Sequence, residues 1–367
     1  MAVGNDPDAA PGPGLAPGSQ AATPARFDSL RRRVFSLPAL VSLVVAGGFL
    51  LFMVTRFDVD LSDTWERVRG ANPWLLIAAF AVHYTTFVFR GARWRMLLRR
   101  AAVRDGREEK TVPGVLYCSQ LVLLGWFVNS IGWLRLGDAF RAYLYQEEYE
   151  ASFSGAIGTI LAERVLDAAL VALILLIVAP FLVGGGDDGV AWAVLGVAAA
   201  LAAALVALLA AMVWAQALLL RWLPGWLAAH YRRFHDGAMG SAHRLPQTTA
   251  LGLMGWMAEM GRMYLVAMAL GFELSAALAV FLTLANSLLS LVPTPGGIGA
   301  VESGVAGLAV RLSALVKEAA TALVLVDRFI TYISVIIVGA IIFAMRPLFR
   351  RRSSPSPGAF PEPADGA

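Results

Sequence analysis

The chain has 367 residues, of which 58% are hydrophobic and 15% charged, and its formal net charge is +4 at pH 7. Soluble globular proteins carry about 25% charged residues, so this composition excludes a water-soluble enzyme and indicates several membrane-spanning helices. The basic residues stand in short blocks at the ends of apolar runs, which favours membrane topology signals over a nucleic-acid surface. Cys118 is the single cysteine and the four histidines are scattered, so we expect no disulfide bond, no metal site and no cofactor.

Both ends of the chain lack the periodicity of a packed core. Residues 1–36 begin with a stretch rich in Pro, Gly and Ala, and we expect them to form a disordered tail. Three arginines, 31–33, precede the first apolar run, which indicates a retained membrane anchor with a cytoplasmic N-terminus. Residues 347–367 are expected to form a second, basic tail that leaves no room for an appended catalytic domain. The membrane domain is therefore expected over 37–346.

Apolar runs suited to membrane crossing recur along the chain. A crossing helix needs roughly 20 apolar residues, and six runs approach or exceed that length. Two further apolar runs, 115–134 and 277–310, are interrupted by polar or helix-breaking residues. The six uninterrupted runs are 38–55, 73–90, 154–183, 190–220, 249–270 and 320–345.

Charge bias predicts how these runs are oriented. The basic segments 90–110 and 221–247 are predicted to be cytoplasmic, whereas the links 56–71 and 184–189 suit the outside. One crossing for every run would place 221–247 outside, but this conflict disappears if 115–150 enters the bilayer and returns. We therefore expect an all-α, polytopic membrane helix bundle with six full spans and two broken or re-entrant elements that enter from opposite faces. Eight full spans with one loop against the charge bias are the alternative.

Charged residues inside two apolar runs are candidates for function, since each costs about 2.5–3.5 kcal/mol to insert. Asp138 and Arg141 are three residues apart and share one helical face. Glu163 and Asp167 are four residues apart, with Arg164 three residues before Asp167, which predicts a buried network of Glu, Arg and Asp. The alternatives are an interfacial helix for the first group and a purely structural ion cluster for the second.

A third candidate is the segment 293–299, PTPGGIG, in the middle of an apolar run. Its prolines and glycines cannot continue a helix, so the backbone must break there. Free N–H groups of 296–299, at the start of the next half-helix, are expected to bind an anion such as a phosphate or a phospholipid headgroup. Glu302 follows as the only nearby charge, and the alternative is an ordinary turn outside the membrane.

The last span holds a fourth candidate, the adjacent pair Asp327 and Arg328. Adjacent helical residues point in different directions, so these two are expected to pair with other helices and not with each other. Asp138 precedes Glu163 by 25 residues, Glu302 precedes Asp327 by the same 25, and each later acid is followed by Arg. An Asn-Ser pair precedes each block. This pattern suggests an inverted-topology repeat with a binding site between its halves.

Four motifs carry a family resemblance: Gly137-Asp138-x-x-Arg141, Glu163-Arg164-x-x-Asp167, Pro295-Gly296-Gly297-x-Gly299-x-x-Glu302 and Arg328. Over most of 38–345 the chain resembles the lysylphosphatidylglycerol synthase transmembrane region, also called the flippase-like family. The first motif of that family usually reads Gly-Glu, so Asp138 is a conservative departure. The resemblance implies a bacterial inner-membrane protein that flips or exports an amphipathic lipid through a polar cavity. Some relatives also attach lysine to phosphatidylglycerol with a further cytosolic domain, an activity not expected here.

The leading hypothesis is a flippase or export permease for an anionic lipid. Arg141, Arg164 and Arg328 would neutralise the lipid phosphate, and the backbone N–H groups of 296–299 would complete the site. The alternatives are a membrane-embedded enzyme acting on a lipid, or a non-transporting partner in a lipid- or glycan-modifying complex. Besides the lipid, the expected partners are further copies of the chain or a lipid-modifying protein. His83, which stands alone in the second span, is expected to pack as a satisfied core residue. The acids expected to hold the arginines are Asp138, Glu163, Asp167, Glu302 and Asp327.

Overall fold

The described residues are arranged as helices only. The computed structural model describes residues 61–104, 106–108, 111–132, 136–182, 188–239 and 245–349, and no strand occurs among them. The predicted all-α class is confirmed for these residues. The expected tail 1–36 and the expected span 38–55 lie outside them. The helix that ends at Phe349 includes 347–349, which were expected to belong to the C-terminal tail.

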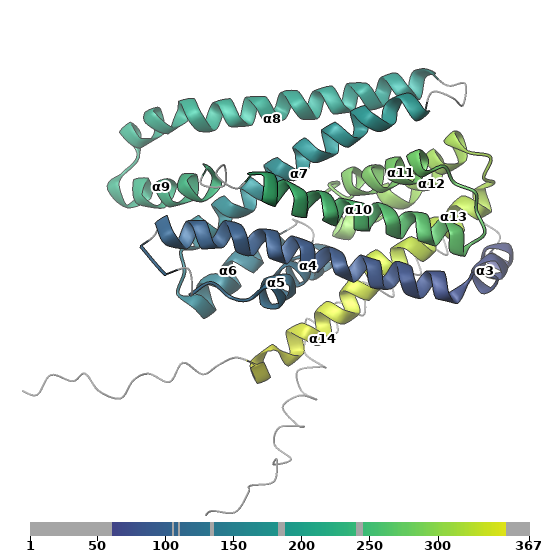
Figure 1. Cartoon of the computed structure of the whole chain (residues 1–367), viewed down its shortest axis with the longest axis horizontal. Helices are drawn as coiled ribbons and strands as arrows, with labels where there is room; N and C mark the ends of the chain where they lie inside the picture. The colour runs from purple at the N-terminus through teal and green to yellow at the C-terminus, as the bar shows by residue number, and fades with distance from the viewer. Residues whose placement is uncertain are drawn as a thin grey trace, which may run out of the picture.

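The described helices differ widely in length, from 9 residues in α3 to 35 in α8 (Figure 1). A 3₁₀ turn, η4 (Pro295–Gly297), precedes α12, and a π-helical turn, η5 (Phe329–Ile333), joins α13 to α14. The α-helices are α3 (Leu61–Arg69), α4 (Pro73–Arg104), α5 (Val115–Ile131), α6 (Gly137–Tyr149), α7 (Phe153–Leu182), α8 (Asp188–Trp222), α9 (Gly225–Met239), α10 (Leu245–Ala269), α11 (Ala276–Leu289), α12 (Ala300–Leu312), α13 (Lys317–Arg328) and α14 (Ser334–Phe349).

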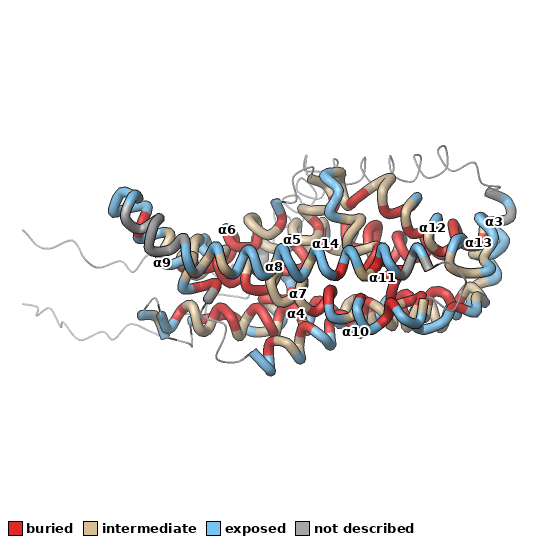
Figure 2. The backbone as a smooth tube through the Cα atoms, turned by 90° about the horizontal axis from the view of Figure 1, so that it is seen from above, coloured by how far each residue is buried: buried red, intermediate tan, exposed pale blue. Residues whose placement is uncertain are grey.

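Several helices have the length and the exposed apolar side chains that are typical of membrane spans. Helix α10 has 25 residues and would extend about 37 Å at 1.5 Å per residue, although it carries Glu259 and Arg262. Helix α8 turns most of its residues outward (Figure 2), and its Trp192 is 73% exposed. Such apolar surface suits contact with lipid and would be an aggregation hazard in water. Within the described residues, four segments are long and apolar enough to cross a membrane: 73–104, 153–182, 192–212 and 317–346.

The order of helices repeats along the chain. A long helix, two short helices and a long helix (α4 to α7) are followed, after α8 and α9, by the same order in α10, α11, α12 and the α13–η5–α14 rod. Helices α4 and α10 lie side by side (Figure 1). The Asn72 N–H donates to the Ala269 carbonyl over 2.8 Å, so the start of α4 meets the end of α10. The two equivalent helices are thus antiparallel, as an inverted repeat requires.

Helices α5 and α6 form a hairpin whose two ends lie together. Arg346 in α14 donates to the Tyr117 hydroxyl near the start of α5 over 3.1 Å. The same guanidinium donates to the Glu148 carboxylate near the end of α6 over 2.8 Å. Arg107, which follows α4, donates to the Tyr149 carbonyl. The hairpin therefore returns to the end of the molecule at which α4 finishes.

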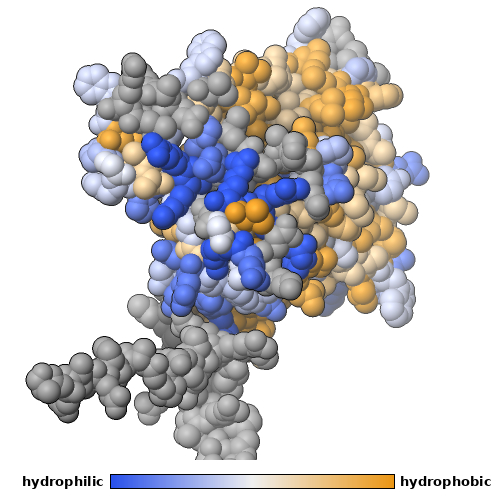
Figure 3. Space-filling view, turned by 60° about the vertical axis from the view of Figure 1, so that its left-hand side comes forward, coloured by the Kyte–Doolittle hydropathy of each residue, from blue (hydrophilic) through white to orange (hydrophobic). Residues whose placement is uncertain are grey.

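That end of the molecule is strongly polar. Arg104 in the last turn of α4 donates to the Asp236 carbonyl of α9 over 2.9 Å, and Arg232 and Arg233 of α9 are exposed. Figure 3 shows hydrophilic side chains gathered over this end, next to a broad apolar surface. Because residues 225–239 form α9 and pack against α7, the expected link 221–247 contains a helix and is not simply a loop.

The first part of the basic segment 90–110 lies inside the helix bundle, whereas its cytoplasmic side stays a prediction. Helix α4 continues without a break through Arg104, and within it Arg90 is 7% and Arg93 0% exposed. Carboxylates of α7 compensate both charges, which is why these arginines remain inside the bundle. The positive-inside count cannot separate them from loop arginines, because both kinds add the same charge to the segment.

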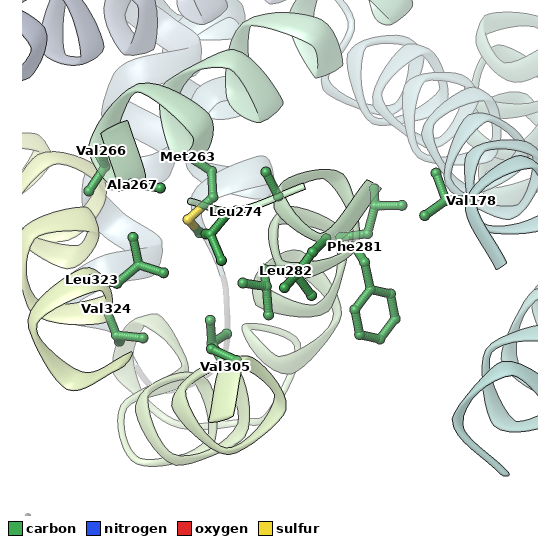
Figure 4. Packing of buried hydrophobic residues seen from close by; sticks show 14 of the residues in the cluster. Val178, Met263, Val266, Ala267, Leu274, Phe281, Leu282, Val305, Leu323 and Val324 are labelled. Atoms are coloured by element: carbon green, nitrogen blue, oxygen red, sulfur yellow. The ribbon is translucent and has the colours of Figure 1, made fainter. Parts of the chain in front are cut away.

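Apolar packing holds the second hairpin, α11 and α12. Leu282 of α11 is 0% exposed and lies in Figure 4 among side chains of α10, α12 and α13. Met263, Val305 and Leu323 are its neighbours in this cluster. In lipid, close van der Waals packing and not the exclusion of water drives such helix association. The cluster therefore fixes the hairpin against the rod that follows it.

Gly137 allows α5 and α6 to touch. A Cβ atom at this position would collide with the Gly125 carbonyl oxygen and lie 2.8 Å from Asn129 Oδ1. We expect Gly137→Ala to lower the unfolding midpoint in detergent, since an overpacked contact costs about 1–3 kcal/mol. Gly307→Ala in α12 is the control, because nothing lies within 4 Å of its added Cβ. Equal midpoints for the two variants would contradict the close approach of the hairpin helices.

Candidate functional site

A cavity of about 360 Å³ lies between the two halves of the molecule. Its walls come from helices of both halves, which is where an inverted repeat places its binding site. Both Asn-Ser pairs, Asn129-Ser130 and Asn286-Ser287, line it, as do the indole side chains of Trp126 and Trp256. The charged residues that line it are Arg90, Arg164, Asp167, Glu259 and Arg328.

Arg93 is the centre of the ion network in the first half. Its Nη1 donates to Asp167 Oδ1 over 2.8 Å, and its Nη2 lies 3.0 Å from Asp167 Oδ2 and 3.2 Å from Glu163 Oε1. Arg90 reaches Asp167 Oδ2 from one turn earlier in α4, over 3.4 Å. Glu163 and Asp167 share one face of α7, so both carboxylates point at α4 together. The expected buried network of Glu, Arg and Asp is confirmed, with α4 supplying partners that sequence reasoning missed.

Arg141 is buried within this network and does not line the cavity. Its side chain is 1% exposed, with Nη2 2.5 Å from Glu163 Oε2 and Nε 3.3 Å from Asp138 Oδ1. The guanidinium carbon lies 4.8 Å from the centre of the Trp94 ring. Because the guanidinium is buried and does not line the cavity, the structure does not support the expected contact between Arg141 and a lipid phosphate. Arg141 is placed to hold Glu163 and Asp138.

Arg164 is the most exposed arginine of this ion network. Its side chain is 41% exposed, and its Nε and Nη2 each lie 3.0 Å from a carboxylate oxygen of Asp138. A longer contact of 3.7 Å joins Nη1 to Asp167 Oδ2. Asp138 orients the guanidinium while part of it faces the cavity. This arrangement leaves a positive charge that a ligand in the cavity can reach.

The second half repeats this pattern with other residues. Arg328 Nε lies 2.6 Å from Glu302 Oε1, and its Nη2 donates to the Gly296 carbonyl over 2.8 Å. Asp327 pairs with Arg262 of α10 and not with its neighbour Arg328, as the helical geometry predicts. The Glu302–Arg328 pair spans 26 residues, the same separation as Asp138–Arg164. The weak repeat in the sequence therefore corresponds to equivalent ion pairs in the two halves of the structure.

The expected backbone anion site at 296–299 must be corrected. The Gly299 N–H donates to Glu302 Oε2 over 2.6 Å, so the carboxylate of Glu302 itself caps the start of α12. The Gly297 N–H donates to Thr294 O over 3.0 Å and the Ile298 N–H to Pro295 O over 3.2 Å. These donors are used inside the turn. Because Glu302 also binds Arg328, the Pro-Gly motif positions an arginine.

Buried residues of α4 and α10 were missed as site residues. Arg90 and Arg93 in α4, like Glu259 and Arg262 in α10, are three residues apart and so share a helical face. The only sequence signal for Glu259 and Arg262 was this spacing inside an apolar run. Arg90 was counted in the basic segment 90–110, yet its guanidinium carbon lies 5.3 Å from the centre of the Trp126 ring and 5.6 Å from that of Trp256.

The two halves touch at the π-helical turn η5. The Tyr332 hydroxyl donates to the Ser130 carbonyl of α5 over 2.8 Å, and the hydroxyls of Tyr84 and Ser334 lie 2.9 Å apart. Thr331 and Tyr332 of η5 also line the cavity. Single π-helical turns inside α-helices often occur at functional positions. The turn therefore links the cavity wall to the contact between halves.

The predicted site residues divide into those that line the cavity and those that support it. Arg164, Asp167, Gly296 and Arg328 line it. The others form the ion pairs and the turn behind that lining. No group of three or more His, Cys, Asp or Glu in the described ranges is placed to hold a metal ion. The supporting residues are Asp138, Arg141, Glu163, Pro295, Gly297, Gly299, Glu302 and Asp327.

Comparison with known proteins finds relatives over most of the chain. Residues 39–339 match the family model described as the lysylphosphatidylglycerol synthase TM region. A UPF0104 membrane protein of Methanocaldococcus jannaschii is 30% identical over 226 residues, which are 59% of this chain and 93% of the relative. A UPF0104 membrane protein of Methanothermobacter thermautotrophicus is 22% identical over 314 residues, which are 79% of this chain and 89% of the relative. No solved structure gives a significant match.

One further relative has a different kind of name. The glycosyltransferase AglD of Haloferax volcanii is 27% identical over 161 residues, which are 43% of this chain but 24% of that protein. These relatives are archaeal, so they do not support the expected bacterial host. The matched family and the UPF0104 relatives are membrane proteins, which confirms the predicted integral, multi-pass character.

Proposed function

The chain belongs to the lysylphosphatidylglycerol synthase transmembrane-region family, and on that premise we propose that it moves an anionic lipid between the two membrane leaflets. The observation that carries the proposal is the cavity lined by Arg90, Arg164 and Arg328, each paired with a carboxylate. Arginine binds phosphate through charge-assisted, often bidentate hydrogen bonds. A headgroup can use this lining while its acyl chains remain in lipid.

The carboxylates explain how such a cavity stays charged at membrane depth. An isolated guanidinium inside the bilayer is costly, whereas one held by a carboxylate is tolerated and kept in position. Arg164 shares its carboxylate, Asp138, with Arg141 and is partly exposed, so it is the guanidinium that a phosphate reaches first. Opening of the cavity toward alternate leaflets would come from rocking of the two halves about their contact at η5.

We also propose the topology of six full spans and two re-entrant hairpins. Helix α5 has 17 residues and α11 has 14, which correspond to about 26 and 21 Å and fall short of the ~30 Å hydrocarbon core. The binding of both ends of the α5–α6 hairpin to Arg346 supports a return to one side. With the charge bias, this topology places both termini in the cytoplasm.

Cysteine labelling tests this topology. In a Cys118→Ala background, which removes the single cysteine, we expect Leu116→Cys and Glu150→Cys to react with a membrane-impermeant maleimide from the same side. These residues are exposed at the start of α5 and just after α6. Trp192→Cys at the start of α8 is expected to react from the opposite side. Labelling of Leu116→Cys and Glu150→Cys from opposite sides would establish a full crossing and eight spans.

Transport by the purified protein tests the function. The full chain is reconstituted in liposomes with a fluorescent phosphatidylglycerol, and a membrane-impermeant reductant quenches the outer leaflet. Loss of fluorescence beyond the outer-leaflet fraction reports movement between leaflets and supports the proposal. A new lipid product in the same vesicles would favour a membrane-embedded enzyme, the alternative to which the name of the AglD relative points. If the vesicles show neither lipid movement nor a new lipid product, the flippase proposal is overturned in favour of a non-transporting partner.

A further inference from the structure

The two halves of the charged site carry unequal charge. Among the described residues, the first half combines four arginines (Arg90, Arg93, Arg141 and Arg164) with three acids (Asp138, Glu163 and Asp167). The second half combines two arginines (Arg262 and Arg328) with three acids (Glu259, Glu302 and Asp327). The repeat therefore leaves one acid in excess on the side of α10. Glu259 occupies the helix position that Arg90 occupies in α4.

Glu259 is the carboxylate with the weakest compensation. Arg328 is bound to Glu302, and Arg262 is bound to Asp327. Glu259 shares Arg262 through one contact, 3.4 Å from Oε2 to Nη2. Its Oε1 is buried and has no hydrogen-bond partner among the described residues, although Glu259 lines the cavity and is 6% exposed. A buried carboxylate with an unpartnered oxygen is costly unless it is neutralised.

His83 faces the same carboxylate from α4. Its Nδ1 lies 4.0 Å from Glu259 Oε2, and neither ring nitrogen has a hydrogen-bond partner among the described residues. The ring is 0% exposed and packs edge-on against Tyr84 and Phe87. The expectation that His83 is a satisfied core residue is therefore wrong for its polar atoms. His83 therefore lies beside Oε2 but beyond hydrogen-bond distance, while Oε1 is enclosed without a hydrogen-bond partner in a side chain that lines the cavity.

The other charged groups around Glu259 are few. Helix α4 presents His83 and Arg90, α10 presents Arg262, and α7 contributes Asp167 and Arg164 to the lining of the same cavity. The rod contributes Asp327, which binds Arg262, and Arg328 on the cavity wall. Helix α11 contains no titratable residue. None of these groups donates a hydrogen bond to Oε1.

We propose that Glu259 binds and releases a transported proton, so that lipid movement is coupled to proton movement. The inference rests on the proposed lipid transport and adds its driving ion. A hydronium ion in water that enters the cavity transfers its proton to the Glu259 carboxylate, which becomes a neutral carboxyl group and leaves a water molecule behind. The proton returns to water when the cavity opens to the other side. Neutral Glu259 makes the cavity more positive, so proton and lipid phosphate bind cooperatively, and by linkage each favours the other. The loaded carrier then moves an anionic lipid and a proton together.

Proteoliposomes with an imposed pH gradient test this coupling. With the membrane voltage clamped at zero, movement of one proton with each lipid makes the lipid gradient at equilibrium equal to the proton gradient. A difference of one pH unit is therefore expected to shift the leaflet ratio of the fluorescent phosphatidylglycerol about tenfold toward the alkaline side. In the Glu259→Gln variant, we expect the lipid to distribute evenly between the two leaflets, whatever the pH gradient. Glu273→Gln, at an exposed position after α10, is the matched control and keeps the response.

The outcomes separate this inference from the proposed function. Lipid movement by the native protein without a response to pH would overturn the coupling and leave the flippase standing. A pH response retained in Glu259→Gln would overturn the assignment to Glu259, and a response to a sodium gradient instead would overturn the proton. An infrared carbonyl band of a protonated carboxyl group, appearing on acidification and absent in Glu259→Gln, supports the proton site without relying on transport. If the same band appears unchanged in Glu259→Gln, the assignment of the proton site to Glu259 is overturned, even if no lipid moves.

Discussion

Replacement of Arg164 by glutamine is expected to slow the movement of fluorescent phosphatidylglycerol about tenfold to a hundredfold. The lost interaction is a charge-assisted hydrogen bond to phosphate, worth about 1.5–3 kcal/mol, and each 1.4 kcal/mol is a factor of ten. The fold should tolerate the change, because Asp138 keeps Arg141 at 3.3 Å and Asp167 keeps Arg93 at 2.8 Å. The liposome assay with the impermeant quencher measures the rate.

Arg104→Gln is the matched control for this prediction. It removes the same charge from a side chain that is 47% exposed at the polar end of α4, away from the residues that line the cavity. We expect native rates for this variant. Equal rates for Arg164→Gln and the native protein, with both proteins monodisperse, would show that the cavity arginine does not contact the transported phosphate.

Replacement of Arg93 by leucine is expected to destabilise the folded protein most strongly. Arg93 is 0% exposed and is bound to both Glu163 and Asp167. Its loss leaves buried Asp167 without its main partner and buried Glu163 with Arg141 alone, and breaking a buried pair in this way costs about 3–5 kcal/mol. We expect a large fall in the unfolding midpoint in detergent and in the yield of monodisperse protein.

Two further variants show whether charge or packing causes that loss. Arg104→Leu on the same helix is expected to change the free energy of unfolding by no more than about 0.5 kcal/mol, as exposed positions usually do. Arg93→Lys keeps the charge but loses the bidentate contact, so it should fall between the native protein and Arg93→Leu. Equal midpoints for Arg93→Leu and Arg104→Leu would mean that the network contributes little to stability.

Much of the fold followed from patterns that are local in the sequence. Hydropathy predicted the long helices over 73–90, 154–183 and 190–220, and the structure places α4, α7 and α8 there. The Pro-Gly run 293–299 predicted a break, and the structure places η4 there between α11 and α12. Helix α9 was missed because a polar surface helix has no apolar run to distinguish it from a loop.

The candidate site could be predicted only in part. Glu163, Asp167 and Arg328 were identified because a charge inside an apolar run is conspicuous on its own. Arg90 and Arg93 were counted in the basic segment 90–110, predicted to be cytoplasmic, because they stand at the basic end of such a run. Which arginines face the cavity, Arg164 and Arg328, and which is enclosed, Arg141, could not be predicted, because exposure depends on neighbouring helices.

Composition, hydropathy and helix-breaking residues were enough to determine the helical membrane class, the interrupted hairpins and the types of charged group near the site, since each depends on adjacent residues. The tertiary structure alone decided the partners of those groups. Arg93 binds Glu163 and Asp167, which lie 70 and 74 residues away in the sequence. The Glu302 carboxylate accepts a hydrogen bond from the turn that was expected to bind a ligand. Such pairings depend on the packing of whole helices, and electrostatic energy inside the bilayer depends on which charges finally lie within a few ångströms of each other.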